Sequence, residues 1–345
     1  MKKCVFVNLN VGSAIEQSGN EILNYVKKIK NLKTVLFKNQ TSESIFFDFL
    51  LNELPDIIVI NGDYSRVQVP VIYYKKLYKN TKIIFISRVL DCFNVENTRK
   101  YKREDFSIFE KQRLEIFYDL CNTMVCVNSC GKFSKYFPQW SDKTIDCCGL
   151  NDPYRFKITK KWKDRTKNFV MIGSLNPHKV SPEFLKILDV PVDVYGHTKN
   201  IEVIDLLESN KNINFKGFCE FEKVPEILNE YKYSIFPHNG YEPFCNTLQQ
   251  CILCGTTPIF LEDKKKDIFD NYWYDWAEGL YIPAENEKDL LKIMKNHINN
   301  GNDISEEIRK KIIERFDLYN TFSNIVYCIE KYINRGFKWD SAEHL

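Results

Sequence analysis

The chain has 345 residues, a formal net charge of +3, 44% hydrophobic residues and 28% charged residues. This length fits two domains of ordinary size better than a single core, and the composition excludes a disordered or fibrous chain. The net charge is too small to indicate binding to nucleic acid or to a membrane by itself.

The chain begins with an apolar run that Asn8 and Asn10 interrupt, and no small-residue cleavage site follows it. We interpret it as a first strand and not as a secretory signal. No run reaches the roughly 18 apolar residues that a membrane-spanning helix needs. A cytoplasmic protein is therefore expected.

The chain contains twelve cysteines, several of them inside apolar segments. In a cytoplasmic protein these are expected to be buried free thiols. Cys251 and Cys254 form a CxxC pair, but a lone pair without nearby histidines is weak evidence for zinc. No metal site is therefore predicted.

The N-terminal half alternates apolar, β-branched runs with helical patterns. Strands are predicted at residues 4–7, 34–38, 56–60, 82–87 and 124–128, and helices at residues 21–29, 42–51 and 107–120. Gly12 and Gly19 are expected in a turn after the first strand. Apolar strands separated by helices predict a parallel sheet covered on both faces. Turn residues near position 150 and a basic stretch up to residue 167 predict an interdomain linker.

The same alternation then starts again. Strands are predicted at residues 168–172, 192–195, 212–216, 234–236 and 257–261, and helices at residues 182–188, 202–209, 223–230 and 246–254. The chain ends in helical segments at about residues 287–299, 305–315 and 320–333. The pattern predicts an α/β protein of two doubly wound domains, residues 1–150 and 151–345, with a ligand at the carboxyl ends of the strands. We expect the last helices to pack back on the N-terminal domain.

Residues 236–260 carry the most informative motif. Glu242 stands on a loop after a strand and just before a helix whose first amides and dipole suit a diphosphate. Its carboxylate can accept hydrogen bonds from the hydroxyls of a neighbouring sugar. Gln250 lies eight positions further on, inside the helix, and Gly255 is expected to end that helix.

This stretch resembles the donor-site motif of retaining glycosyltransferases of the GT-B type, the glycosyltransferase group 1 or family 4-like enzymes. In that motif Glu-x-Phe, here Glu242 and Phe244, is followed by a second acidic residue and a small-residue turn. Gly173, Ser174 and then Lys179 resemble the strand end that carries a basic pair for the donor diphosphate. Residues 215–218 resemble the loop that holds the nucleobase. Residues from about 110 to 263 match in order and spacing, and the first hundred match only in architecture.

The resemblance implies two facing Rossmann-like domains, of which the N-terminal one binds the acceptor and the C-terminal one binds a nucleotide sugar. It implies that Glu242 contacts the transferred sugar and that Lys179 neutralises the departing diphosphate. The implied donor contacts also include the nucleobase loop, backbone amides at the phosphates and Gln250 at the ribose. These contacts comprise Gly173, Ser174, Gly217, Phe218, Phe244, Cys245, Asn246, Thr247 and Gln250.

The sequence departs from the family pattern at several positions. Gln250 stands where the second acidic residue is expected, Ser174 replaces the first basic residue, and Val180 replaces a glycine. All five histidines follow the predicted linker, so the N-terminal domain has none. Asp91 is the substitute candidate for a catalytic group on the acceptor side.

The resemblance implies transfer of a hexose from a nucleotide sugar, expected to be UDP-linked, with retention and with no required cofactor. The acceptor is expected to be a saccharide or a lipid-linked molecule. The basic cluster at residues 99–103 is either a solvated face or a contact for an anionic acceptor, such as DNA or a lipid phosphate at a membrane surface.

Three alternatives remain open. Phage enzymes that glucosylate DNA bases share this fold, and salt-sensitive binding to duplex DNA would favour that function. Ser174 and Gln250 are also compatible with a catalytically silent protein that binds a nucleotide sugar. An epimerase of the GT-B type would need more catalytic carboxylates than the sequence places.

Overall fold

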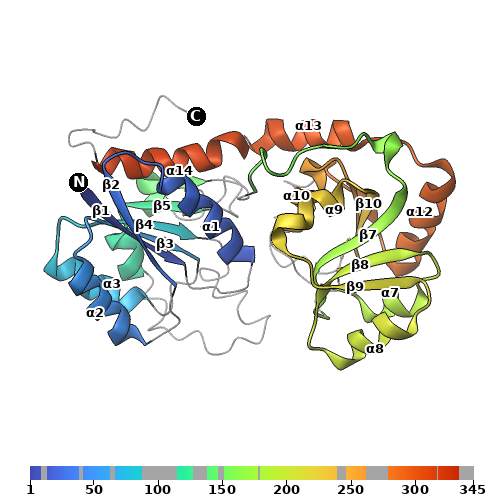
Figure 1. Cartoon of the computed structure of the whole chain (residues 1–345), viewed down its shortest axis with the longest axis horizontal. Helices are drawn as coiled ribbons and strands as arrows, with labels where there is room; N and C mark the ends of the chain where they lie inside the picture. The colour runs from blue at the N-terminus through green and yellow to red at the C-terminus, as the bar shows by residue number, and fades with distance from the viewer. Residues whose placement is uncertain are drawn as a thin grey trace. The chain divides into compact units, whose positions relative to one another are not determined.

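The computed structural model describes residues 1–8, 14–38, 42–62, 67–87, 115–126, 138–146, 151–177, 179–238, 246–261, 279–316 and 318–333. The chain divides into two compact units (Figure 1). The first unit consists of Met1–Leu150 with Leu318–Leu345, and the second of Asn151–Asp317. Each unit contains a six-stranded sheet in which all neighbouring strands are parallel. The predicted doubly wound α/β organisation is therefore confirmed.

The first sheet has the strand order β2-β1-β3-β4-β5-β6. Its strands are β1 (Lys2–Asn8), β2 (Leu32–Phe37), β3 (Ile57–Asn61), β4 (Lys82–Ser87), β5 (Thr123–Cys126) and β6 (Thr144–Asp146). The unit's helices are α1 (Ala14–Val26), α2 (Glu43–Glu53), α3 (Gln68–Leu77), the 3-10 turn η1 (Pro138–Lys143) and α14 (Leu318–Ile333).

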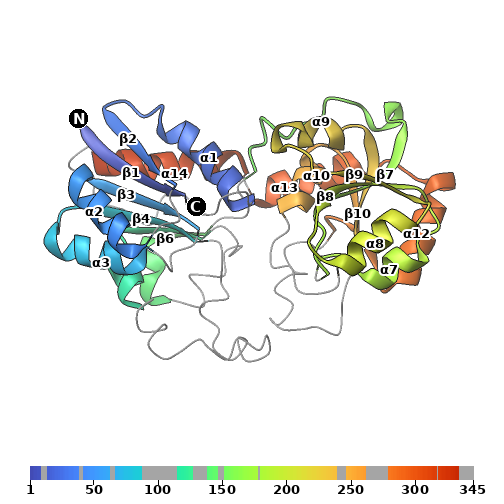
Figure 2. The same ribbon diagram turned by 60° about the horizontal axis from the view of Figure 1, so that its bottom comes forward.

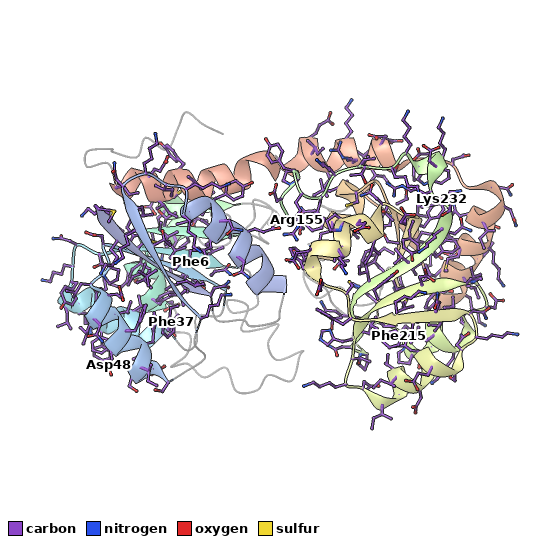
Figure 3. All side chains as sticks on the ribbon, in the orientation of Figure 1. Phe6, Phe37, Asp48, Arg155, Phe215 and Lys232 are labelled. Atoms are coloured by element: carbon purple, nitrogen blue, oxygen red, sulfur yellow. The ribbon has the colours of Figure 1, made fainter. Side chains whose placement is uncertain are left out.

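Successive apolar residues of these strands enter two separate cores, one on each face of the sheet. Phe6 belongs to the core that α1 and α14 cover, and Phe37 belongs to the core that α2 and α3 cover (Figure 3). This two-sided burial explains why the strands are almost continuously apolar in sequence.

Three elements of the first unit differ from the prediction. Helix α1 begins at Ala14, so Gly19 lies inside the helix and not in a turn. Helix α3 was not predicted, because its sequence is rich in β-branched and aromatic residues and contains Pro70, which is tolerated in the first turn. The three-residue strand β6 is too short to leave a recognisable pattern.

The second sheet has the strand order β12-β11-β10-β7-β8-β9. Its strands are β7 (Lys167–Ser174), β8 (Val192–His197), β9 (Ile213–Gly217), β10 (Tyr231–Phe236), β11 (Thr257–Leu261) and β12 (Ile282–Ala284). The helices are α7 (Pro182–Ile187), α8 (Ile201–Ser209), α9 (Val224–Leu228), α10 (Asn246–Leu253), α12 (Glu287–Asn300) and α13 (Ser305–Phe316). Figure 2 shows α9 on the opposite side of this sheet from α7 and α8.

The segment predicted as a linker is part of the second unit from residue 151 onward. Phe156 is fully buried, and Arg165 is 2% exposed. The Arg165 guanidinium donates hydrogen bonds to the carbonyl groups of Tyr231 and Cys254 and to the Thr256 hydroxyl. Arg165 is thus a structural residue of the second unit, whereas Lys157, Lys161, Lys163 and Lys167 of the same stretch are exposed.

Within the described ranges, none of the helices combines the length and the hydrophobicity that crossing a bilayer requires.

Candidate functional site

The carboxyl ends of β7, β8 and β9 meet at one edge of the second sheet, and each of them ends near a glycine. Gly173 pairs with Gly196, and Gly217 ends β9. Their φ angles are +137°, +155° and +72°, a region that favours glycine. A Cβ atom on Gly196 would lie 2.0 Å from the Gly173 carbonyl oxygen. The glycine at position 196 therefore allows β7 and β8 to approach each other closely, whereas a Cβ atom on Gly217 would meet nothing within 4 Å.

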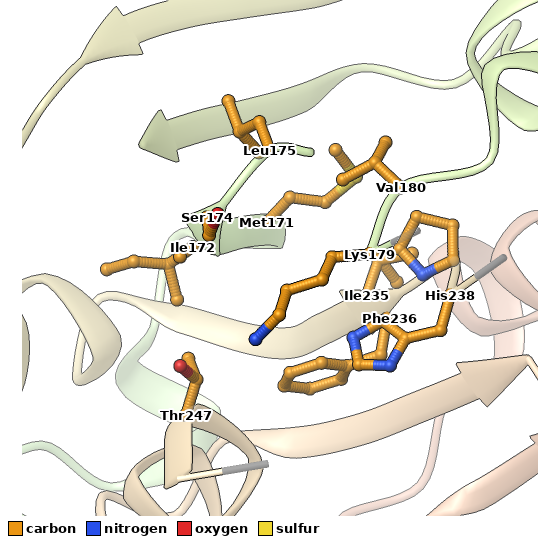
Figure 4. A pocket seen from close by; sticks show the side chains of 12 residues that line it. Met171, Ile172, Ser174, Leu175, Lys179, Val180, Ile235, Phe236, His238 and Thr247 are labelled. Atoms are coloured by element: carbon orange, nitrogen blue, oxygen red, sulfur yellow. The ribbon is translucent and has the colours of Figure 1, made fainter. Parts of the chain in front are cut away.

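A pocket opens at this edge beside the end of β7. In Figure 4 the Lys179 side chain extends across the pocket toward Thr247, with Ser174 on the far wall. The pocket lining consists of Met171, Ile172, Gly173, Ser174, Leu175, Lys179, Val180, Ile235, Phe236, Pro237, His238 and Thr247.

A short turn after β7 positions Lys179. The backbone amides of Lys179 and Val180 both donate to the Asn176 carbonyl, at 2.8 and 3.0 Å. The Asn176 side chain donates to the Ser174 hydroxyl at 2.8 Å, which ties the turn to the strand end. The Ser181 amide then donates to the Pro237 carbonyl at 2.7 Å, so the lysine segment is attached to the end of β10.

The first turn of α10 forms the opposite side of the pocket. A Cβ atom on Gly173 would lie 3.6 Å from the Thr247 Oγ1 atom, so the β7 end and the helix start are in close proximity. The first amides of a helix have no intrahelical acceptor, and the helix dipole places partial positive charge there. A lysine ammonium group and a helix N-terminus directed at one pocket make a site for an anion such as a phosphate.

Asn151 holds the start of α10 in place. Its side-chain nitrogen donates to the Asn246 carbonyl at 3.2 Å and to Gln249 Oε1, and its side-chain oxygen accepts from Gln250 Nε2 at 2.8 Å. Gln250 is only 6% exposed. Part of its amide is thus engaged within the protein, and its contact with a ribose stays a prediction. Asn151 lies among the turn residues near position 150, and nothing in the sequence indicates its contact with a helix about a hundred positions away.

The far end of α10 is fixed as well. Gly255 has a φ of +73°, and its amide donates to the Ile252 carbonyl while the Thr256 amide donates to the Cys251 carbonyl. These are the two hydrogen bonds of a Schellman motif. The prediction that Gly255 ends the helix is confirmed.

An exposed aromatic surface lies at the ends of β8 and β9, along the same sheet edge. Phe218 follows Gly217 directly and is 66% exposed, and its ring centroid lies 6.0 Å from that of His197. His197 is paired with Ser174 in the strand register. The predicted nucleobase loop thus coincides with a real strand end.

The structure brings together Gly173, Ser174, Lys179 and Thr247, with Asn246 at the start of the same helix. Gln250 lies one turn further along α10, and Gly217 and Phe218 lie two strands from β7. The remaining predicted site residues, Asp91, Glu242, Phe244 and Cys245, lie outside the described residues. The basic cluster at residues 99–103 and Gly12 also lie outside them. Across the described residues, no group of three or more His, Cys, Asp and Glu side chains could hold a metal ion.

Comparison with known proteins gave matches in structure only. The sequence matches no protein-family model and no curated protein. HepE from Anabaena, in complex with UDP-glucose, superposes with a TM-score of 0.67 at 13% identity, covering 96% of this chain and 100% of HepE. Sucrose-phosphate synthase from Thermosynechococcus elongatus gives 0.65 at 10% identity, covering 96% and 99%. UDP-GlcNAc 2-epimerase from Neisseria meningitidis, bound to UDP-GlcNAc, gives 0.62 at 13% identity, covering 95% and 100%.

Similarity over almost the whole length of these chains shows that the protein has the GT-B fold, as predicted. At identities this low the similarity establishes the fold alone, and the fold is common to transferases and an epimerase.

Proposed function

We propose that this protein is a glycosyltransferase that uses a nucleotide sugar as its donor. The observation that carries the proposal is the pocket at the end of β7, where Lys179 and the first turn of α10 converge. Both supply positive charge to the pocket. A diphosphate is the part of a nucleotide sugar that such a site would bind.

The distance between this pocket and the aromatic surface supports the same ligand class. Phe218 follows β9, which is two strands from β7, a separation of roughly 10 Å. A nucleoside diphosphate bound along the edge would place its phosphates at Lys179 and its base at Phe218 and the backbone of Gly217. A UDP-linked donor is favoured, since HepE of the same fold was crystallised with UDP-glucose.

In the proposed reaction, Lys179 and the α10 amides stabilise the negative charge that develops on the diphosphate as it leaves. Glu242 contacts the transferred hexose, and the reaction proceeds with retention. The first unit binds the acceptor, which we propose to be a saccharide or a lipid-linked molecule, with Asp91 on the acceptor side. The role of Glu242 and the retention rest on the resemblance of the motif, and Asp91 is the candidate that substitutes for the histidine which the N-terminal domain lacks.

The proposal is tested by calorimetric titration of UDP and UDP-glucose into the wild type and a Lys179→Met variant. Methionine keeps the unbranched stem and removes the charge. Loss of one charge-assisted contact to phosphate should weaken UDP binding by roughly tenfold or more. The matched control is Lys186→Met, because Lys186 lies on the neighbouring helix α7 and pairs with Glu202 on the surface. Equal affinity in all three proteins would contradict the donor site.

Product analysis distinguishes a glycosyltransferase from an epimerase and from a silent binding protein. Incubation with UDP-sugars and an acceptor panel should yield UDP and a glycosylated acceptor. The epimerase structure of the same fold makes a second outcome informative. Conversion of the donor sugar without any acceptor would replace the proposed function by epimerisation, and binding without any conversion would indicate a silent binding protein.

A further inference from the structure

The amino ends of the strands in the first sheet form an edge with a high density of lysines. In a parallel sheet all strands start at one edge, and here the covering helices run back to it and end there. Helix α1 is followed by three lysines, β2 contains one at its start, and the end of α3 and the turn after it add two more. We call the following six exposed residues the basic edge: Lys27, Lys28, Lys30, Lys33, Lys76 and Lys79.

Two acidic groups near the basic edge are paired with lysines that do not belong to it. Glu53 and Asp56 lie at this edge, but they form ion pairs with Lys3 and Lys2. None of the six lysines of the basic edge makes a salt bridge with the part of the chain that the structure describes.

Large apolar side chains are exposed beside these lysines. Tyr73 and Leu77 are 57% and 64% exposed, and their spacing of four residues puts them on one side of α3. Leu54, at the end of the adjacent helix α2, is 52% exposed, and the two helices pack side by side (Figure 1). The Lys76 ammonium nitrogen lies 5.8 Å from the centre of the Tyr73 ring. Tyrosine and leucine next to lysine are typical of helices that lie at a bilayer interface.

We propose that the basic edge, together with Tyr73 and Leu77, docks on a membrane surface that contains anionic lipids. Lysine ammonium groups would meet the lipid phosphates, and the apolar side chains would enter the boundary between headgroups and acyl chains. A nucleic acid would account for the charge but would leave Leu54 and Leu77 without a favourable environment. This proposal does not depend on the proposed transfer activity.

Lysines near helix C-termini also complement the helix dipole. That role alone requires no exposed apolar side chains and predicts no affinity for lipid. The two explanations therefore differ in a measurable property of the full-length protein.

The test is co-sedimentation of the full-length protein with phosphatidylcholine vesicles that contain or lack phosphatidylglycerol. We expect binding only to the anionic vesicles, weakened by added salt. Reversing two charges in Lys76→Glu/Lys79→Glu should reduce binding by roughly tenfold or more. The matched control is Lys288→Glu/Lys292→Glu, which makes the same charge change at exposed positions of α12 and should bind as the wild type does. If the first variant does not fold, Lys28→Glu/Lys30→Glu at the same edge replaces it.

A second pair of variants tests the apolar part at constant charge. Tyr73→Ser/Leu77→Ser should weaken vesicle binding, whereas Ile201→Ser/Ile298→Ser should not, although Ile201 is 74% exposed. Absence of binding to anionic vesicles, or equal losses in a variant and its control, would overturn the proposal. It would also be overturned if duplex DNA bound more tightly than vesicles and the serine pair at residues 73 and 77 had no effect.

Discussion

At the scale of single residues, Gly19 is a helix position where a tertiary contact disfavours alanine. Alanine normally stabilises a helix interior relative to glycine. Here a Cβ atom would lie 2.2 Å from Asn61 Nδ2 and 2.7 Å from the side-chain amide of Asn8. Both asparagines are buried at the ends of β3 and β1, and Asn61 donates to Asn8 at 2.8 Å. A side chain at position 19 would therefore require the buried amides of Asn61 and Asn8 to move.

We predict that Gly19→Ala destabilises the first unit by about 1–3 kcal/mol through overpacking. The measurement is the denaturant or thermal unfolding midpoint. Asn24→Ala is the control, because Asn24 is an exposed residue of the same helix and its replacement should be neutral or stabilising by about 0.5 kcal/mol. A more stable Gly19→Ala protein would show that the asparagines move aside at little cost.

At the scale of elements, α10 is held at both ends, by Asn151 at its start and by the Gly255 motif at its end. This fixation of α10 affects Gln250, which stands where the motif that this stretch resembles has an acidic residue. The Gln250 Nε2 atom donates to the Asn151 side-chain oxygen. A carboxylate at position 250 would place a second acceptor oxygen against that oxygen and would have no hydrogen to donate.

We predict that Gln250→Glu, which introduces the acidic residue of the motif that this stretch resembles, lowers stability by about 1–3 kcal/mol through this lost donor. UDP affinity should not increase. Thermal unfolding and calorimetric titration of the variant measure the two effects. A midpoint equal to that of the wild type, with tighter UDP binding, would mean that the carboxylate turns to the ribose as the family motif implies.

Helix α12 contacts the second sheet through His297, whose ring centroid lies 4.9 Å from that of Tyr233. Burial lowers the pKa of His297 below its usual value of 6.5, so the folded state favours the neutral ring. The unfolded chain then binds a proton at higher pH than the folded one. The contribution of this group to stability is therefore present above about pH 6.5 and is lost as the pH falls through its folded pKa.

We expect His297→Phe, which keeps the ring contact and removes the titration, to lose less stability than the wild type between about pH 7.5 and about pH 5.5. Unfolding midpoints of both proteins at the two pH values measure the difference. Parallel pH profiles would show that His297 protonates equally easily in both states.

At the scale of the whole molecule, the first unit is discontinuous in sequence. Ile325, Cys328 and Ile329 of α14 are buried in the same core as Phe6 and Ile22, and the Tyr332 hydroxyl donates to the Asn122 carbonyl at 3.1 Å. The second unit is continuous and contains every residue that lines the pocket beside the end of β7.

We predict that a fragment of residues 151–317 unfolds cooperatively and binds UDP, whereas a fragment of residues 1–150 does not fold, because one face of its sheet lacks α14. Circular dichroism during thermal unfolding and UDP titration of both fragments make the measurement. Cooperative melting of the 1–150 fragment would contradict the role assigned to α14.

Much of the fold could be predicted because its cause is local in sequence. Strands buried on both faces are continuous apolar runs, and the helices between them repeat apolar residues with the helical period. These two patterns were enough to predict the order of the elements and the parallel sheets. Gly255 and Gly217 mark a helix end and a strand end through backbone conformations that favour glycine. Helix α3 and the short strands β6 and β12 could not be predicted, because their sequences carry a β-like pattern or no pattern.

The sequence by itself determined the two α/β halves and the positions of Lys179 and Gln250 relative to the strands and helices of the second half. Only the tertiary structure decided that Asn151 accepts a hydrogen bond from the Gln250 amide, that Arg165 is buried, and that six lysines share one edge. The physical reason is sequence separation. The Asn151–Gln250 contact joins residues 99 positions apart, and such pairings depend on how sheets and helices pack rather than on any local pattern.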